Sequence, residues 1–491
     1  MLNGRKTMLN KRNLKILGVA LLMVMCTGLL AFGESGNHEN LGNELPIWSC
    51  IPFVGMLLSI AIFPLVKPHW WEHNMLKIAM FWSLAFLIPF GIAFGVGALS
   101  FQIAEIVFLD YLPFIVLLFG LFVAAGGIVI KGSFAGTTKT NIIILLVGTA
   151  LASWVGTTGA AMLMIRPIMR ANAWRKNKAH IIIFFIFMVA NIGGSLTPVG
   201  DPPLFLGFLR GVPFFWTMKL LPIMLFNIAL LIVIFFFLDR RFFKKELAEG
   251  RKPPIVLPEE RQSLCIEGAH NFIFVAMIVG AVILNGVLSG MSAFRDAAGE
   301  LAGINLAGAI MPYTSMIQMA IILLAAFLSM KLTKKETRQE NEFTFAPIAE
   351  VAKLFIGIFL TMIPALAILK ANGAYLGLIE PWQFFWVTGG LSSFLDNAPT
   401  YLVFLTTACA CGFEEGLSTS IGVVDTTVLV AISSGAVFMG ANTYIGNAPN
   451  FMVKSIAEEG KIKMPSFFGY MGWALVFLVP VLLLDTLIFF L

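Results

Sequence analysis

The stretch GGSLTPVGDPP, at residues 193–203, interrupts a long apolar segment with glycine, proline and a carboxylate. The second half of the chain has a similar stretch, GANTYIGNAPN, at residues 440–450. Glycine and proline leave backbone groups unpaired, and a membrane tolerates such groups only where protein buries them or a polar cavity solvates them. Interrupted segments in corresponding positions of two halves are typical of a secondary transporter's binding site.

Each of these segments follows another interrupted segment, which breaks at GTTG from Gly156 in the first half and at LDNAPT around Asp396 in the second. The spacing is similar in both halves: 45 residues separate Gly156 from Asp201, and 51 separate Asp396 from Asn447. We therefore predict two structural repeats, each with a re-entrant hairpin and an interrupted helix. The four interrupted segments lie near residues 141–171, 180–211, 383–411 and 427–458.

The composition predicts a polytopic α-helical membrane protein. Hydrophobic residues make up 58% of the 491 residues and charged residues only 12%, with a mean hydropathy of +0.89, whereas soluble domains carry about 25% charged residues. No run of Lys and Arg is interleaved with aromatic residues, so we expect no nucleic-acid partner. The five cysteines lack the spacing of zinc ligands, and we interpret them as packing residues.

The apolar segments predict eleven crossings if both hairpins are re-entrant. The N-terminus would then lie inside and the C-terminus outside. A basic stretch, residues 1–15, precedes a first apolar segment, residues 16–32, which is either a cleaved signal peptide or a retained span; we favour retention. Uninterrupted spans are expected near residues 47–66, 76–98, 104–130, 216–238, 270–290, 313–333, 349–369 and 467–490.

The distribution of charge agrees with this topology. The predicted inside segments hold 29 of the 33 Lys and Arg residues, as the positive-inside rule requires. The second half starts on the opposite side from the first, so the repeats are inverted. We expect a multi-pass protein of the inner (cytoplasmic) membrane, with a cytoplasmic N-terminus if the first segment is retained. The predicted inside segments are residues 1–15, 67–77, 131–139, 166–178, 239–268, 331–353 and 454–463.

These boundaries divide the chain into four parts. The expected parts are a signal-like or first transmembrane segment with an outer loop (1–46), transmembrane repeat 1 (47–238), a cytoplasmic linker (239–269) and transmembrane repeat 2 (270–491).

Asp201 and Asp396 are carboxylates inside interrupted segments. A charged group at the bilayer centre costs roughly 3 kcal/mol on insertion scales, so such residues usually bind an ion, carry a proton or meet a partner. Both could also cap helices, since Pro202 and Asn397 follow them directly. Capping and ion binding are compatible, and we predict that both residues bind sodium or protons. By contrast, Asp110 and Asp485 lie near predicted membrane edges and are interpreted as interfacial.

Neutral oxygen and amide groups accompany these carboxylates. A sodium ion would take carboxylate, hydroxyl, amide and unwound carbonyl oxygens, whereas nearby helix N-termini would favour an anion. Any single Ser or Thr could instead be a packing residue bonded to its own helix. The predicted neutral site residues are Thr157, Thr158, Ser195, Thr197, Asn397, Thr400, Asn442, Thr443, Asn447 and Asn450.

At the four breaks the sequence resembles the ion transporter superfamily, which includes citrate carriers, arsenite pumps and NhaD-type sodium/proton antiporters. The stretch from Gly193 to Asp201 is similar to the antiporters' Gly-Gly…Ser-Pro-Ile-Gly-Asp segment, and LDNAP from Leu395 is similar to their Leu-Asp-Asn-Val-Pro hairpin. The resemblance implies that Asp201, Asp396 and Asn397 take the ion and proton role.

Two departures separate this chain from the antiporters. Their first hairpin usually carries its own Asp-Asn, whereas this chain has GTTG from Gly156. The stretch GNAPN, residues 446–450, is closer to the carboxylate and citrate branch, although neither hairpin tip has that branch's Ser-Asn-Thr.

We therefore predict a sodium/proton antiporter, with a sodium- or proton-coupled citrate or dicarboxylate transporter of the same fold as the alternative. The expected partners are a small inorganic ion or a carboxylate and the lipid bilayer, and assembly as a homodimer stays open. We expect no enzyme and no cofactor beyond the transported or coupling sodium ion or proton. An intramembrane aspartyl protease, with Asp110 and Asp201 as its dyad, would leave the second half's breaks unexplained.

Overall fold

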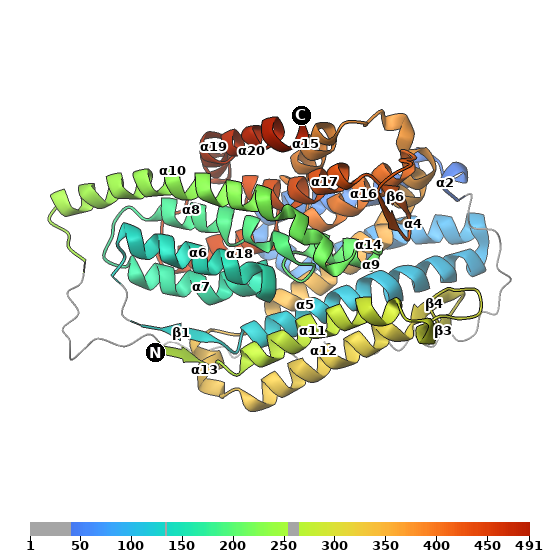
Figure 1. The fold of residues 1–491 in the computed structure, drawn as a ribbon, viewed down its shortest axis with the longest axis horizontal. Coiled ribbons are helices and arrows are strands. Elements are labelled where there is room, and N and C mark those ends of the chain that lie inside the picture. The colour runs from blue at the N-terminus through green and yellow to red at the C-terminus, as the bar shows by residue number, and fades with distance from the viewer. Residues whose placement is uncertain (1–40, 133–134, 254–264) are drawn as a thin grey trace.

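The computed structural model describes residues 41–132, 135–253 and 265–491, and these are almost entirely helical (Figure 1). The predicted first segment therefore lies outside the described residues. The helices are α2 (Leu41–Glu44), α3 (Ile51–Val66), α4 (Pro68–Ala104), α5 (Leu112–Ala125), α6 (Thr138–Val155), α7 (Thr157–Ala171), α8 (Ala179–Met188), α9 (Pro202–Leu209), α10 (Leu221–Ala248), α11 (Asn271–Ser289), α12 (Tyr313–Leu332), α13 (Lys335–Glu340), α14 (Ala346–Asn372), α15 (Pro381–Ser392), α16 (Asn397–Ala410), α17 (Thr426–Met439), α18 (Ala448–Glu459), α19 (Phe467–Phe477) and α20 (Val479–Asp485). Three short two-stranded antiparallel sheets pair β1 (Val129–Lys131) with β2 (Cys265–Glu267), β3 (Gly303–Leu306) with β4 (Ala309–Pro312), and β5 (Leu417–Thr419) with β6 (Gly422–Val424).

The predicted all-α polytopic membrane fold is confirmed. Among the described residues, eight helices are long and apolar enough to cross a membrane, and nine if the bent pair α19 and α20 forms one span. This count differs from the eleven predicted crossings because the first segment lies outside the described residues, residues 69–125 count as one helix and the second interrupted segment is not counted, whereas the hairpin arm α6 is. That long helix is interrupted at Gly95, where φ is 86°, within the span expected at residues 76–98.

Both re-entrant hairpins and both interrupted helices are present. Gly156 joins α6 to α7 with φ 83° and ψ 149°, a conformation that residues with a Cβ rarely adopt. In the second half, α15 and α16 form the corresponding hairpin around Asp396. Non-helical backbone separates α8 from α9 and α17 from α18, at the two glycine-rich stretches.

The two hairpins enter from opposite sides. The first hairpin, α6 and α7, packs beside α8 and α18, whereas the second, α15 and α16, packs beside α17 and α9. Since α8 precedes the first break and α18 follows the second, the hairpins approach the breaks from opposite ends. Figure 1 shows α6, α7, α8 and α18 at one end and α15, α16 and α17 toward the other.

Buried apolar side chains form two large cores. The hairpin core is built mainly from α6–α8, α10 and α15–α20. The outer core is built mainly from α3–α5, α11, α12 and α14. Helices α9 and α16 contribute side chains to both cores, so the breaks at which they begin lie close to the boundary between them.

Four of the predicted inside segments meet at one end of the molecule. Lys131 bonds Glu267 and Glu340 at 2.8 and 2.7 Å, and Arg166 of α7 bonds Glu342 at 2.7 Å. The structure thus groups these Lys- and Arg-rich segments, and the membrane face to which they belong stays a prediction. Helix α10 continues to Ala248, past the end expected at residue 238.

Candidate functional site

The tips of both hairpins and both helix breaks meet at the carboxylate of Asp201, which is 1% exposed. Thr157, from the first tip, donates to Oδ1 at 2.8 Å. Asn397, from the second tip, donates to Oδ2 at 2.5 Å. Asn447, from the second break, donates to Oδ1 at 3.3 Å. The site is therefore shared between the two halves of the chain.

The local sequence explains why these four residues converge. Thr157 and Asn397 are the first residues of α7 and α16, and Asp201 and Asn447 are the N-caps of α9 and α18, where proline follows within two residues. Four helices therefore begin around one point. Each N-terminus carries about half a positive charge from its helix dipole, so the site offers substantial positive potential without a basic side chain.

The second break is tied to the first by a chain of buried amides. Asn447 donates to Oδ1 of Asn191 at 3.1 Å, and Asn191 donates to Oδ1 of Asn450 at 2.7 Å. Asn450 in turn donates to the backbone oxygens of Gly440 and Thr443 at 2.8 and 2.9 Å. These bonds satisfy carbonyl groups that the interruption leaves unpaired.

The same contact secures each hairpin to its break. Thr197 donates to the backbone oxygen of Ser153, and Thr443 donates to the backbone oxygen of Ser393. In the first half, Ser153 also donates to the oxygen of Gly193 at 2.5 Å. The contacts of Thr197 and Thr443 are consistent with the predicted repeat, and they give both threonines a structural role.

The structure brings the other predicted residues near the tips without placing them on Asp201. Asp396 caps α16 by accepting from the amide of Ala398 at 3.1 Å, and Thr400 donates to the oxygen of Asp396 at 2.9 Å. Ser195 donates to the oxygen of Ile192 at 2.9 Å.

Neither Asp201 nor Asp396 forms an ion pair within the described part of the chain. A buried carboxylate without a cationic side chain calls for a proton or a bound cation. Oδ1 of Asn397 is buried and has no hydrogen-bond partner. A carboxylate, a hydroxyl and this free amide oxygen together form a donor set that suits a hard monovalent cation.

Asn442 offers a second free amide oxygen. Its Nδ2 donates to the hydroxyl of Ser393 at 3.0 Å, while its Oδ1 is buried without a partner. Thr158 follows Thr157 on α7 and is half-buried, but it does not bond Asp201.

Comparison with known families agrees with this architecture. The model of the family described as putative citrate transport matches residues 42–490, which is nearly the whole chain. The chain belongs to the putative citrate transport family. No protein with a curated description matches the chain. The resemblance expected from the four breaks is thus confirmed at the level of an ion or citrate transporter family, and the closer resemblance to antiporters stays a prediction.

Two site residues of this citrate-transport family member were missed by the sequence analysis. Asn191 is fully buried and joins the two breaks, and Ser153 connects the first hairpin to residues 193–197. Asn191 could have been found because it is the single amide side chain in the apolar run that leads into Gly193. Ser153 lies in an ordinary helical stretch, and its sequence context carries no comparable signal.

Asp110 and Asp485, which were interpreted as interfacial, are both buried within the protein, and their depth in the membrane stays a prediction. Asp110 is 1% exposed and pairs with Arg210 at 2.6 Å. It therefore pairs with an arginine. The protease alternative would require it to pair with Asp201. Asp485 is fully buried and accepts hydrogen bonds from Asn227.

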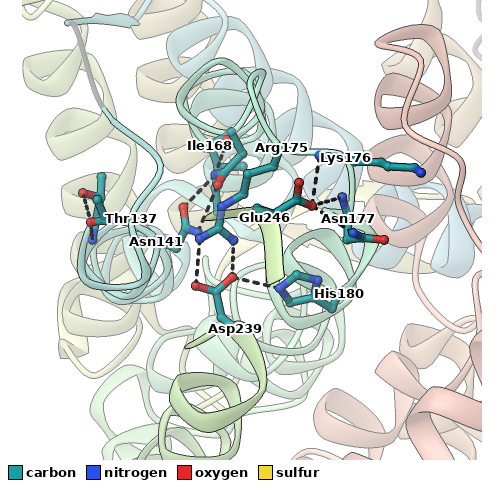
Figure 2. A network of polar contacts seen from close by, with 11 residues as sticks. Thr137, Asn141, Ile168, Arg175, Lys176, Asn177, His180, Asp239 and Glu246 are labelled. Carbon is teal, nitrogen blue, oxygen red and sulfur yellow. Dashed lines mark hydrogen bonds and ion pairs between the residues drawn. The ribbon is translucent and has the colours of Figure 1, made fainter. Parts of the chain in front are cut away.

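A separate polar network fixes the loop between α7 and α8 to the end of α10. Figure 2 shows Asp239 between Arg175 and His180, and its contact with His180 is 2.8 Å long. Glu246 accepts from the amides of Lys176 and Asn177 at 3.1 and 2.6 Å. These acids are thus compensated within the network, and His180 is part of this anchor.

Proposed function

We propose that the protein is a secondary transporter that exchanges sodium ions for protons at Asp201. The observation that carries this proposal is a buried carboxylate at the meeting point of both hairpins, held by three neutral donors and paired with no cationic side chain among the residues that the structure describes. In membrane interiors such carboxylates serve as ion sites and proton relays.

The proposed chemistry is competition for one carboxylate. A proton bound to Asp201 neutralises it and leaves nothing to attract sodium. Once that proton leaves, the carboxylate, the hydroxyl of Thr157 and the free amide oxygen of Asn397 can bind the cation. Exchange follows if the site opens alternately to the two sides, and the inverted hairpins give each side its own covering element. We place Asp396 at the same site as a second acid, one residue from Asn397.

A second candidate is cation-coupled transport of citrate or a related carboxylate. Two observations favour it: the family to which the chain belongs, and the four helix N-termini that surround the site. A bound cation would neutralise Asp201, and the helix dipoles would then attract the anion. We place the protein in the cytoplasmic membrane in either case, with the Lys- and Arg-rich end inside.

Transport by reconstituted protein separates the two candidates. Proteoliposomes with an imposed pH gradient and a trapped pH dye would receive sodium, lithium, potassium and citrate in turn. If the protein exchanges sodium for protons, sodium alone should dissipate the pH gradient and citrate should have no effect on it. Citrate uptake that requires sodium would contradict sodium/proton exchange and support the second candidate. Asp201→Asn is the matched control, because it removes the charge and keeps the shape, and it should abolish either activity.

A further inference from the structure

Asp485 is a buried acid that the proposed exchange does not use. It ends α20 and is 0% exposed. Both of its carboxylate oxygens lie 2.8 Å from Nδ2 of Asn227 on α10. That nitrogen also donates to the oxygen of Ile223 at 2.8 Å. One amide group with two hydrogens therefore serves three acceptors, which is poor compensation for a full negative charge.

The other buried acids outside the site are compensated differently. Asp110 pairs with Arg210 at 2.6 Å, and Asp239 lies between Arg175 and His180 (Figure 2). Asp485 forms no ion pair within residues 41–132, 135–253 and 265–491. An ionised carboxylate in that position would be a desolvated charge facing a single neutral donor, which proteins avoid by binding a proton.

Asn227 supplies a second and independent indication. Its Oδ1 is fully buried and has no hydrogen-bond partner. Because the oxygen and nitrogen of an amide side chain are nearly indistinguishable in position, a rotated Asn227 would present Oδ1 to Asp485. This oxygen could then accept the O–H of a protonated Asp485. The rotation must also turn Oδ1 away from the oxygen of Ile223, which Nδ2 contacts at 2.8 Å and which keeps its backbone partner within α10.

We infer that Asp485 and Asn227 form a second proton-binding site, separate from Asp201, in which Asp485 carries the proton. Other titratable groups on the neighbouring helices have partners of their own or are remote. Tyr470 of α19 donates to the oxygen of Ala441 at 2.8 Å. The charged residues of α10 begin at Asp239, twelve residues beyond Asn227 and so about 18 Å along the helix.

The site borders the second hairpin. Thr486, the residue after Asp485, begins a π-helical turn (Thr486–Phe490) and accepts from Nε1 of Trp386 at 2.9 Å. Trp386 belongs to α15, the first arm of that hairpin. Loss of the proton would therefore place a charge on the residue next to this contact with the hairpin arm. The inference does not depend on which ion Asp201 transports.

Infrared difference spectroscopy of the purified full-length protein at neutral pH tests this inference. The wild type minus Asp485→Asn spectrum should contain the C=O band of a protonated carboxylic acid. Asp425→Asn is the matched control: the side chain of Asp425 caps α17 by accepting from backbone amides at a partly exposed position, and Asn preserves the cap. Its difference spectrum should contain carboxylate bands. Carboxylate bands in the Asp485→Asn difference would overturn the inference.

A second variant keeps the inference testable if Asp485→Asn does not fold. Asn227→Leu removes the hydrogen-bond partner but leaves the acid. The acid band should persist and move to higher wavenumber, because losing the hydrogen bond with Asn227 strengthens the C=O bond of the acid. Disappearance of the band, or a spectrum identical to that of the wild type in this region, would contradict the proposed pair. Asp201→Asn should leave the Asp485 band in place.

Discussion

Asn397 donates to Asp201 at 2.5 Å across 196 residues of sequence, and this bond joins the tip of the second hairpin to the break of the first interrupted helix. Neither half of the chain therefore builds the site alone. A change in the position of either hairpin must therefore alter the hydrogen bonds of the same carboxylate.

Replacing Asn397 with alanine should weaken sodium binding about 10- to 100-fold, because a hydrogen bond to a charged group is worth about 1.5–3 kcal/mol. Calorimetric titration with sodium would measure the change. Asn372→Ala is the matched control, since Asn372 only donates to the oxygen of Gly42 at 3.4 Å, away from the site. Equal sodium affinities in both variants would show that Asn397 is not part of the ion site.

Asp201→Asn and Asp396→Asn should each abolish coupled ion movement while the protein stays folded. Asn caps a helix about as well as Asp, so Asp396→Asn should change the stability of α16 by no more than about 0.5 kcal/mol. Transport in proteoliposomes and thermal unfolding in detergent, measured together, separate ion binding from capping. Wild-type transport by Asp396→Asn would leave Asp396 with capping alone.

Gly156→Ala should destabilise the protein by about 1–3 kcal/mol, because its backbone angles are open essentially to glycine only. We expect a lower unfolding temperature and a large loss of transport, since Thr157 follows directly. Gly390→Ala in α15 is the control. That glycine has open space around its Cα, and alanine there should stabilise the helix by up to about 1 kcal/mol. A Gly156→Ala variant as stable as wild type would contradict this.

Arg210→Gln should destabilise the fold by roughly 3–5 kcal/mol, because it leaves the buried charge of Asp110 without its partner. The double variant Arg210→Gln with Asp110→Asn should recover much of this loss, since no unpaired charge remains. Thermal unfolding of the two single variants and the double variant forms the required cycle. Additive losses would show that the pair is not coupled.

Cysteine labelling should establish the orientation of the protein in the membrane. In a cysteine-free background, Glu415→Cys should react with an impermeant thiol reagent added outside intact cells, and Glu249→Cys should react only after the membrane is opened. Both residues are exposed and lie in loops of opposite predicted sidedness. The reverse labelling would invert the topology predicted from the positive-inside rule.

The sequence was sufficient to locate the hairpins and breaks because lipid gives glycine, proline and polar residues a strong positional meaning. It could not show which residues meet at the centre. Asp396 and Asn397 are neighbours in sequence, yet only Asn397 bonds Asp201, because Asp396 is turned toward the amide of Ala398 as a helix cap. Such a choice depends on the angle at which the hairpin tip approaches.

The burial of Asp485 is a second feature that the sequence could not predict. Its position close to the chain end suggested the membrane edge, but the final span bends by 41° between α19 and α20 and packs against α10. The burial of Asp485 follows from this packing, and the apolar pattern alone carries no information about the bend. The sequence also could not predict the partner of Asp110, because Arg210 is 100 residues away.

The division into a hairpin core and an outer core has a mechanical consequence. Arg166 of α7 reaches Glu342, and Arg210, just after α9, reaches Asp110, so ionic contacts connect the two cores toward opposite ends of the molecule. Relative movement of the cores would break these two ion pairs and shift α9 and α16, whose side chains pack in both cores. Because Asp201 and Asp396 cap the starts of those two helices, such a movement would act directly on the site.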